Sequence, residues 1–402
     1  DEAEILTVIR QEKLDDSQAI LDYIDNHKDM GFVNLSKIAE YANALREYNE
    51  AFYTRPNIVY TVVKNFPEAS KYKSLRIMEP SVGVGNFLPC LIAKYRDVPQ
   101  VVIDVCDIDS VSVGIVHKLL SVLDVPSNIH INFIVADSLL YDFPCRYDIV
   151  VGNPPYKKLA GKQALLRLYK EKAENKETNN LFSFFIEKAL RCADVAALIV
   201  PKSLISAPEF NETRHVMERH KIARIVDFGE KAFRGVKIET VAFVVNTKEE
   251  PNDTKVESYI TDMVYAHKQT YITDHRFPYW LIYRNETFDA VAEKMQLGIF
   301  TAYRDRSITK KHTQSCGTIR VLKSRNIASN EILDIDGYDC YVDNADDFGV
   351  SEYINRQDCV LVPNLTYYPR ACFMPRNSIC DGSVAILTLK DSHIKITEED
   401  LA

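Results

Sequence analysis

Seven short apolar segments rich in β-branched residues lie between residues 76 and 245, and helix-length stretches separate most of them. The segments are residues 76–78, 101–106, 131–135, 147–151, 195–200, 222–228 and 241–245. Strands that alternate with helices form a mostly parallel sheet that carries helices on both faces. The pattern therefore predicts an α/β fold built on a doubly wound, seven-stranded, Rossmann-like sheet.

The character of the chain changes on both sides of this region. Residues 1–48 are polar with apolar residues at helical spacing, which predicts an N-terminal helical segment. After residues 49–250, which hold the sheet, a polar stretch around Pro251 is typical of a linker. Residues 251–402 have short mixed segments and many aromatic residues, which predict a second, mixed or mainly β domain. This domain ends on a helix-like start, "KITEEDL", and one interpretation is that it is incomplete.

The bulk composition limits the classes of protein to consider. No apolar stretch is long enough to span a bilayer and no signal-peptide pattern is present, so we expect neither membrane insertion nor secretion. The nine cysteines form no CxxC pair, which favours reduced thiols in a cytoplasmic protein, and we expect no metal site. A net charge of −8 excludes a uniformly basic coat for nucleic acids but leaves room for a local basic surface.

Three of the predicted strands end in glycine or acidic residues. The first runs into "MEPSVGVGNFL", where Gly83 and Gly85 would let a ligand approach the backbone. The second ends at Asp107, 22 residues beyond Gly85, which is the spacing of a carboxylate that binds a ribose diol. The third ends at Asp137. Ligands of such sheets lie beyond the carboxyl ends of the strands, so these turns predict a binding site.

The fourth strand ends in Asn153-Pro154-Pro155-Tyr156. Two prolines remove two backbone donors, fix two φ angles and push the preceding residues towards an extended conformation. The result is a stiff segment that can hold an amide side chain and a carbonyl oxygen in fixed positions. A rigid turn that merely ends the strand is the alternative, but the glycine loop and Asp107 at the same edge favour a site.

In this order of motifs the sequence resembles the γ-class N6-adenine DNA methyltransferases of bacterial restriction–modification systems. The part after the sheet is similar to the recognition region of type IIS-associated members. The upstream segment typical of the family is here "AFYTRPNIV", with Arg55 between the usual Thr and Pro, and Val82 stands where the family often has a smaller residue. The resemblance implies a methyltransferase domain over residues 49–250 and a target-recognition domain over residues 251–402. It also implies a bacterial cytoplasmic protein that reaches the nucleoid through DNA.

The resemblance implies S-adenosylmethionine as the cofactor. The implied contacts are Tyr53 and Thr54 at its amino-acid end, Glu79, Ser81, Gly83 and Gly85 around its methionine part, Asp107 at its ribose, and Asp137 and Ile108 at its adenine. Two of these residues have competing interpretations. Thr54 precedes Pro56 and is also typical of a helix cap, whereas Ile108 is also typical of core packing.

The resemblance also gives the Asn-Pro-Pro-Tyr segment a chemical role. The exocyclic N6 of adenine is a poor nucleophile because its lone pair is delocalised into the ring. Two acceptors, the Asn153 side-chain oxygen and the Pro154 carbonyl, would favour a pyramidal nitrogen. The adenine must leave the duplex to reach them. Tyr156 would then offer a stacking face, with Phe233 implied opposite; an ordinary buried position is an equally good interpretation of Phe233.

Two stretches rich in Lys and Arg predict contact with double-stranded DNA. Residues 157–176 carry seven Lys or Arg against two Glu, and Lys157 and Lys158 directly follow the catalytic segment. Residues 302–327 carry seven Lys or Arg and one Asp. Among them, Arg320, Lys323 and Arg325 are the candidates for phosphate or guanine contacts. A solvated charged surface is the alternative for each. No nuclease pattern is evident, so a cognate restriction endonuclease would be encoded separately.

Two other functions remain open on the sequence alone. Similar Asn-Pro-Pro-Tyr segments occur in enzymes that methylate RNA adenine or a protein glutamine, whose amino groups are equally deactivated. The basic stretch and the long C-terminal part favour DNA over a glutamine side chain. A different class of protein, an inactive DNA-binding subunit with a methyltransferase fold, is disfavoured because the whole set of motif residues is intact.

Overall fold

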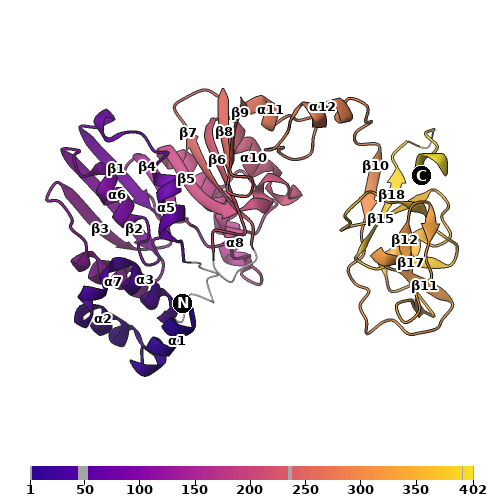
Figure 1. The fold of residues 1–402 in the computed structure, drawn as a ribbon, viewed down its shortest axis with the longest axis horizontal. Coiled ribbons are helices and arrows are strands. Elements are labelled where there is room, and N and C mark those ends of the chain that lie inside the picture. The colour runs from indigo at the N-terminus through magenta and orange to yellow at the C-terminus, as the bar shows by residue number, and fades with distance from the viewer. Residues whose placement is uncertain (1, 44–52, 234–237, 392, 402) are drawn as a thin grey trace. The chain divides into compact units, whose positions relative to one another are not determined.

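The computed structural model describes residues 2–43, 53–233, 238–391 and 393–401. The chain divides into two compact units, Asp1–Asp289 and Ala290–Ala402. Figure 1 shows the first unit from indigo to orange and the second from orange to yellow. None of the helices in the described ranges is long and apolar enough to cross a membrane.

A nine-stranded sheet forms the centre of the first unit, in the order β3-β2-β1-β4-β5-β7-β6-β8-β9. Strands β1 to β5 are parallel to their neighbours within this group, whereas β7 is antiparallel to β5 and β6. The bounds are β1 Ser74–Glu79, β2 Gln100–Asp107, β3 Ile129–Val135, β4 Tyr147–Gly152, β5 Ala193–Pro201, β6 Lys221–Gly229, β7 Thr240–Asn246, β8 Asp253–Ser258 and β9 Met263–Lys268. The carboxyl ends of β1 to β4 therefore lie along one edge of the sheet.

Helices connect the parallel strands and pack against the sheet through apolar side chains. α7 contacts β2 and β3, α9 contacts β4 and β5, and α10 contacts β6. The core between them is formed by residues such as Ile77, Val150, Leu91 and Phe182. The helices are α1 Glu2–Gln11, α2 Ser17–Asn26, α3 Gly31–Ala42, α5 Pro56–Val63, α6 Leu88–Tyr95, α7 Ser110–Leu119, α8 Gln163–Lys172, α9 Leu181–Cys192, α10 Asn211–Glu218, α11 Gln269–Ile272 and α12 Glu286–Ala292.

The predicted α/β class is confirmed, and each of the seven predicted segments lies in one of the strands β1 to β7. The sheet nevertheless has nine strands, because β8 and β9 extend it beyond the domain boundary predicted at residue 250. The first unit accordingly runs to Asp289, and the stretch around Pro251 is the short connection between β7 and β8. Strand β9 was not predicted: it has apolar residues, such as Met263 and Val264, but none of its residues is buried, so it has no face that packs in the core.

The N-terminal segment forms α1, α2 and α3, as its periodicity predicts. Buried side chains of these helices, such as Ile24 and Leu35, form one cluster with Val84 after β1 and Ile115 of α7. The helices are therefore packed onto the sheet domain as part of the first unit. The predicted end of this segment, at residue 48, lies outside the described residues.

The second unit consists mainly of short strands around a small core that includes Leu322, Leu361, Ile379 and Ile386. An antiparallel sheet has the order β10-β18-β15-β16, a second sheet has the order β14-β11-β17, and β12 pairs with β13. The bounds are β10 Phe300–Tyr303, β11 Ile319–Leu322, β12 Ile327–Ala328, β13 Glu331–Ile332, β14 Cys340–Val342, β15 Cys359–Pro363, β16 Cys372–Phe373, β17 Ser378–Cys380 and β18 Val384–Leu389. This arrangement agrees with the mainly β character expected from the sequence.

Candidate active site

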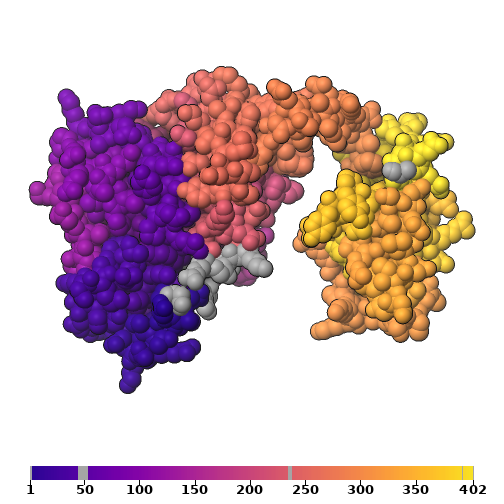
Figure 2. Space-filling model, in the orientation of Figure 1, coloured from indigo at the N-terminus to yellow at the C-terminus, as the bar shows by residue number. Residues whose placement is uncertain are grey.

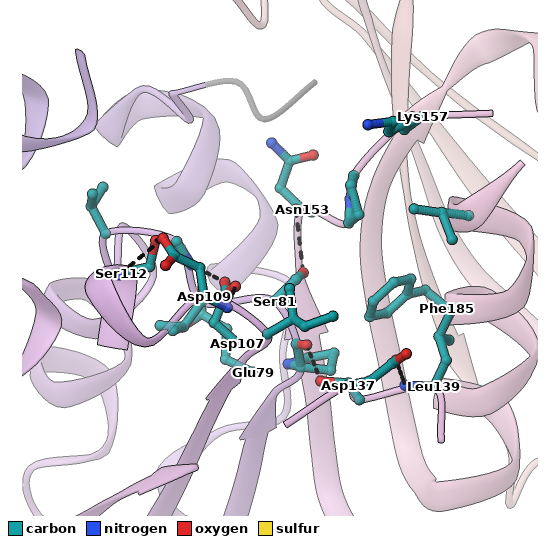
Figure 3. Close-up of a pocket in the computed structure, with 18 of the residues that line it drawn as sticks. Glu79, Ser81, Asp107, Asp109, Ser112, Asp137, Leu139, Asn153, Lys157 and Phe185 are labelled. Atoms are coloured by element: carbon teal, nitrogen blue, oxygen red, sulfur yellow. Dashed lines mark hydrogen bonds between the residues drawn. The ribbon is translucent and has the colours of Figure 1, made fainter. Parts of the chain in front are cut away.

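A pocket lies at the edge of the sheet where β1 to β4 end. Figure 3 shows Asp107 and Asp109 on one side of it, Phe185 on the other, and Asn153 between them. Ten of the residues singled out in the sequence line this pocket: Thr54, Glu79, Ser81, Gly83, Asp107, Ile108, Asp137, Asn153, Pro155 and Lys157. The parallel strands thus bring together motifs that are about 100 residues apart in the chain.

Asp107 ties the loop after β1 to the end of β2. Its Oδ2 accepts a hydrogen bond from Gly83 N at 3.0 Å, and its Oδ1 accepts one from Asp109 N at 3.0 Å. Burial raises the pKa of Asp107, and these backbone hydrogen bonds offset part of that effect. A carboxylate oxygen accepts more than one hydrogen bond, so both oxygens can also bind a ligand hydroxyl.

The two glycines of this loop have different roles. Both have left-handed backbones, with φ of 52° at Gly83 and 77° at Gly85. A Cβ on Gly85 would lie 3.0 Å from the side chain of Leu88 and 3.3 Å from that of Val116, whereas a Cβ on Gly83 would meet nothing within 4 Å. Gly85 therefore serves close packing under the loop and does not line the pocket, while Gly83 forms part of the pocket wall.

Glu79 ends β1 with a buried carboxyl group. Its side chain is 2% exposed and lines the pocket, and its Oε2 has no hydrogen-bond partner among the described residues. Removal from water raises the pKa of Glu79 well above its ordinary value, and repulsion by Asp107 raises it further. Burial of a negative charge without a partner costs free energy, so the Glu79 carboxylate would favour a cationic ligand group beside it.

Asn153 is held at the pocket by two earlier parts of the chain. Its Nδ2 donates to Thr54 Oγ1 at 3.0 Å, and its backbone oxygen accepts a hydrogen bond from Ser81 Oγ at 3.4 Å. The capping interpretation of Thr54 is wrong, because α5 begins at Pro56 with Arg55 as its N-cap and no side chain caps it. The buried Thr54 hydroxyl instead orients the amide of Asn153.

The side of the pocket assigned to the cofactor adenine is formed by Ile108 and Asp137. Ile108 is 64% exposed on the pocket wall, so the core-packing interpretation of this residue is wrong. Asp137 Oδ1 accepts from Leu139 N at 3.0 Å, and its Oδ2 accepts from the Tyr169 hydroxyl at 2.6 Å. Tyr169 lies on α8, within the basic stretch of residues 157–176, and this helix buries Leu166 and Tyr169 on one face.

The end of α3 also lines the pocket, which no motif indicated. Glu40 and Asn43 both face it, and Asn43 Nδ2 donates to Asp109 Oδ2 at 2.9 Å and to Ser112 Oγ at 3.2 Å. Burial would raise the pKa of Asp109, but hydrogen bonds from Asn43, Ser112 and the start of α7 hold it below its ordinary value. The first helices of the chain thus complete one wall of the pocket.

Tyr156 and Phe233 are both buried and contact each other, with ring centroids 6.0 Å apart and planes inclined by 60°. The Tyr156 hydroxyl donates to Ile199 O at 3.2 Å, and burial raises the pKa of this phenol well above its ordinary value. A base stacked between two parallel rings needs a separation of about 7 Å. The two predicted stacking residues are therefore neighbours, and a base can enter between them only after the rings separate.

Three other predicted residues lie outside the pocket lining. The Tyr53 hydroxyl lies 3.4 Å from both Ser36 Oγ and Val33 O, so this residue contacts α3. Pro154 is buried. Lys158 Nζ lies 3.1 Å from Glu209 Oε1 in an exposed ion pair, in contrast to Lys157, which lines the pocket.

The three cations predicted to contact DNA from the second unit differ in their surroundings. Arg320 forms ion pairs with Asp334 at 2.6 Å and Asp339 at 2.7 Å, so its charge is neutralised within the unit. Lys323 donates to Tyr338 O, and its Nζ lies 3.8 Å from the centre of the Tyr338 ring. Arg325 is exposed and stacks on the same ring at 4.8 Å. Arg325 is consequently the most accessible of the three.

Residues 128–233 match the model of a family described as Eco57I restriction-modification methylase. This segment includes Asp137, Asn153 and Phe233. The predicted resemblance to methyltransferases of restriction–modification systems is thereby confirmed. A curated relative, the type II methyltransferase M.VspI of Vibrio sp. (strain 343), is 26% identical over 215 residues, which are 50% of this chain and 48% of the relative. The chain therefore spans about half the length of the curated relative that it matches.

Two solved structures are among those similar to this chain. The type IIG restriction endonuclease BpuSI is similar with a TM-score of 0.56 at 15% identity, over 90% of this chain and 56% of that one. The methyltransferase subunit of a type I restriction–modification system from Streptococcus thermophilus is similar with a TM-score of 0.44 at 15% identity, over 56% of this chain and 51% of that one. The likeness to BpuSI is one of fold, and it extends over most of the chain.

Proposed function

We propose that this protein is a DNA methyltransferase that transfers a methyl group from S-adenosylmethionine to the exocyclic N6 of an adenine flipped out of the duplex. The observation that carries the proposal is one pocket that is lined by Asn153, Glu79 and Asp107, each at the end of one of three adjacent strands. The match of residues 128–233 to a restriction–modification methylase family supports methyl transfer.

The residues of the pocket fit S-adenosylmethionine. Glu79 offers a buried carboxyl oxygen that has no partner in the described chain, which suits the ammonium group. Asp107 offers acceptors for ribose hydroxyls, and Ile108 offers an exposed apolar face for a purine ring. When bound, the cofactor supplies an electrophilic methyl group on a sulfonium centre.

Asn153 and Pro154 prepare the nitrogen that receives the methyl group. The two N6 hydrogens of the adenine donate to the Asn153 side-chain oxygen and to the Pro154 carbonyl, which favours a pyramidal nitrogen with an available lone pair. Methyl transfer would leave the cofactor as a neutral thioether and place positive charge on this nitrogen, which the Asn153 side-chain oxygen and the Pro154 carbonyl would stabilise. The nitrogen then loses one proton to water. Thr54 keeps the amide oriented throughout through its 3.0 Å hydrogen bond.

DNA is the proposed substrate because the second unit presents side chains suited to nucleic acid. Leu365, Tyr367 and Tyr368 are 88%, 105% and 66% exposed, and the Arg370 guanidinium lies 5.9 Å from the centre of the Tyr368 ring. Exposed aromatic side chains next to a cation are typical of surfaces that stack on bases and contact phosphates. We therefore assign target recognition to this unit, and propose a separately encoded restriction endonuclease as the functional partner of the enzyme.

The proposal is tested by incubating the protein with labelled S-adenosylmethionine and unmethylated bacterial DNA, with Asn153→Ala alongside, and by mapping modified bases. We expect N6-methyladenine confined to one sequence, lost in the variant while cofactor binding is kept. Transfer to RNA or to a protein glutamine in place of DNA would contradict the assigned substrate. Failure to bind S-adenosylmethionine in calorimetry would contradict the enzyme assignment and favour an inactive DNA-binding subunit.

A further inference from the structure

Two histidines and a glutamate meet on the surface of the first unit, among residues that the proposed methyl transfer does not use. His215 and Glu218 lie one turn apart on α10, and His275 follows α11. One ligating atom from each of these three side chains lies within 4.8 Å of the other two. His275 Nε2 is 3.3 Å from Glu218 Oε2, and the two imidazole rings have centroids 5.5 Å apart.

The carboxylate of this cluster is held in place from behind. Glu218 Oε1 accepts a hydrogen bond from the indole Nε1 of Trp280 at 2.5 Å, which leaves Oε2 on the side of His275. Trp280 is itself 4% exposed, packs edge-on against Phe243, and donates its backbone N–H to Ile205 O at 3.0 Å. An outer hydrogen bond that orients a ligating carboxylate is a regular feature of protein metal sites.

The charges around the cluster favour a cation. The Glu212 carboxylate lies 3.7 Å from His215 Nδ1 and adds a second negative charge. The neighbouring cations are engaged elsewhere: Arg219 pairs with Glu174 at 2.7 Å, and the buried Arg214 donates to the backbone oxygens of Leu204, Ala207 and Pro278. Arg214 therefore acts on Glu218 only at a distance, and neither of these two arginines forms an ion pair with the Glu218 carboxylate within the described ranges.

We propose that His215, Glu218 and His275 form a zinc site with a fourth position open to water. Two imidazoles and one carboxylate are a regular ligand set for Zn²⁺. Zinc bonds of about 2.1 Å in tetrahedral geometry separate neighbouring ligand atoms by about 3.4 Å. The Glu218–His275 distance already matches this value, and small rotations of the half-buried His215 and the exposed His275 bring in the third ligand.

The site would fasten the turn at residues 274–280 to α10. The cysteine spacings gave no indication of it, because its ligands come from histidines that are 60 residues apart in the chain. Zn²⁺ that binds the folded protein and not the unfolded chain raises the free energy of unfolding. The site therefore predicts that added zinc stabilises the protein.

The test is calorimetric titration of the chelator-treated full chain with Zn²⁺. We expect one equivalent to bind, with affinity at least about tenfold lower in His215→Ala and in His275→Ala. His130→Ala, which removes an exposed histidine on β3, should bind as the unchanged protein does. Zn²⁺ should also raise the melting temperature of the unchanged protein and fail to do so in His275→Ala.

Absorption of the Co²⁺-loaded protein separates this site from binding by cysteines. A site of nitrogen and oxygen ligands lacks the strong near-ultraviolet band that thiolate ligands give, and Cys316→Ser, which removes the exposed cysteine, should leave binding unchanged. The proposal is overturned if Zn²⁺ does not bind, or if it binds equally well to both histidine variants. If the variants melt at the same temperature as the unchanged protein in the absence of metal, their substitutions have not disturbed the fold.

Discussion

Asn153 Nδ2 donates a hydrogen bond to Thr54 Oγ1 at 3.0 Å, and this contact joins the segment after β4 to the segment before α5. We expect Thr54→Val to lower the rate of methyl transfer about tenfold, equivalent to ~1.4 kcal/mol, because the amide loses its orientation. Thr54→Ser keeps the hydroxyl and should retain most of the rate. Single-turnover methylation at saturating cofactor measures the effect, and equal rates for both variants would contradict the orienting role.

The raised pKa of Glu79 predicts a pH-dependent cost in stability. Between the ordinary value of 4.5 and the raised pKa, the folded protein keeps a proton that the unfolded chain has lost. The free energy of unfolding therefore falls as pH rises through this window, by ~1.4 kcal/mol per pH unit from this group.

Glu79→Gln has no such titration. We expect it to melt at a higher temperature than the unchanged protein above this window, while its affinity for S-adenosylmethionine falls. Thermal denaturation at several pH values measures the first effect, and calorimetry measures the second. Glu331→Gln, a change at an exposed carboxylate in the second unit, is the control. Identical pH dependence of Glu79→Gln and the unchanged protein would refute the assignment.

Alanine at each glycine of the β1–α6 loop should have a different effect. Both changes place an L side chain in the left-handed region, at a cost of about 1 to 2 kcal/mol. Gly85→Ala adds a clash with Leu88 and Val116, so it should lower the melting temperature more than Gly83→Ala does. Gly83→Ala should act mainly on cofactor affinity, because this residue lines the pocket. The opposite ranking in denaturation experiments would count against the packing role of Gly85.

Removal of the exposed Tyr367 side chain should weaken DNA binding without affecting stability. Stacking of an aromatic side chain on a base contributes about 1 to 3 kcal/mol, so Tyr367→Ala should lower affinity for target DNA about tenfold. Tyr60→Ala, at a 64% exposed position on α5 of the first unit, is the matched control. Fluorescence anisotropy with a labelled duplex measures the affinity of both variants. If Tyr367→Ala binds DNA as tightly as Tyr60→Ala does, Tyr367 does not contact the DNA.

Arg325 and Arg320 allow a direct comparison of two arginines on neighbouring elements of the second unit. Arg325→Ala should weaken DNA binding and reduce its dependence on salt, because this exposed side chain can reach a phosphate. Arg320→Ala should instead lower the melting temperature, because it leaves Asp339 without its ion-pair partner. The comparison requires affinity measured at several salt concentrations together with thermal denaturation. A salt dependence that changes only in Arg320→Ala would reverse this assignment.

The sequence was most informative about the edge of the sheet. Each of the first four strands has an apolar run and ends in a residue type that is unusual for a plain turn, so Asp107 and Asn153 could be assigned to one pocket. The periodicity of apolar residues and the spacing of motif residues can both be found within a short stretch of sequence. Once the strands are known to be parallel, their carboxyl ends must lie at one edge of the sheet.

Contacts from distant helices could not be predicted in the same way. Asn43 and Tyr169 reach the pocket from α3 and α8 through tertiary packing, and nothing in their own surroundings in the sequence distinguishes them. Charge was equally ambiguous: the basic stretch around Arg320 suggested a DNA contact, but Asp334 and Asp339 neutralise this side chain from later in the chain.

The hydrogen bonds from Asn43 to Asp109 and Ser112 tie the end of the first helices to the pocket of the sheet domain. A shortened chain that began at Pro56 would keep every motif from the glycine loop onwards, yet it would lose a wall of its pocket and the cover over Ile115. Any shortened or chimeric form of this chain should therefore keep the N-terminal helices together with the sheet.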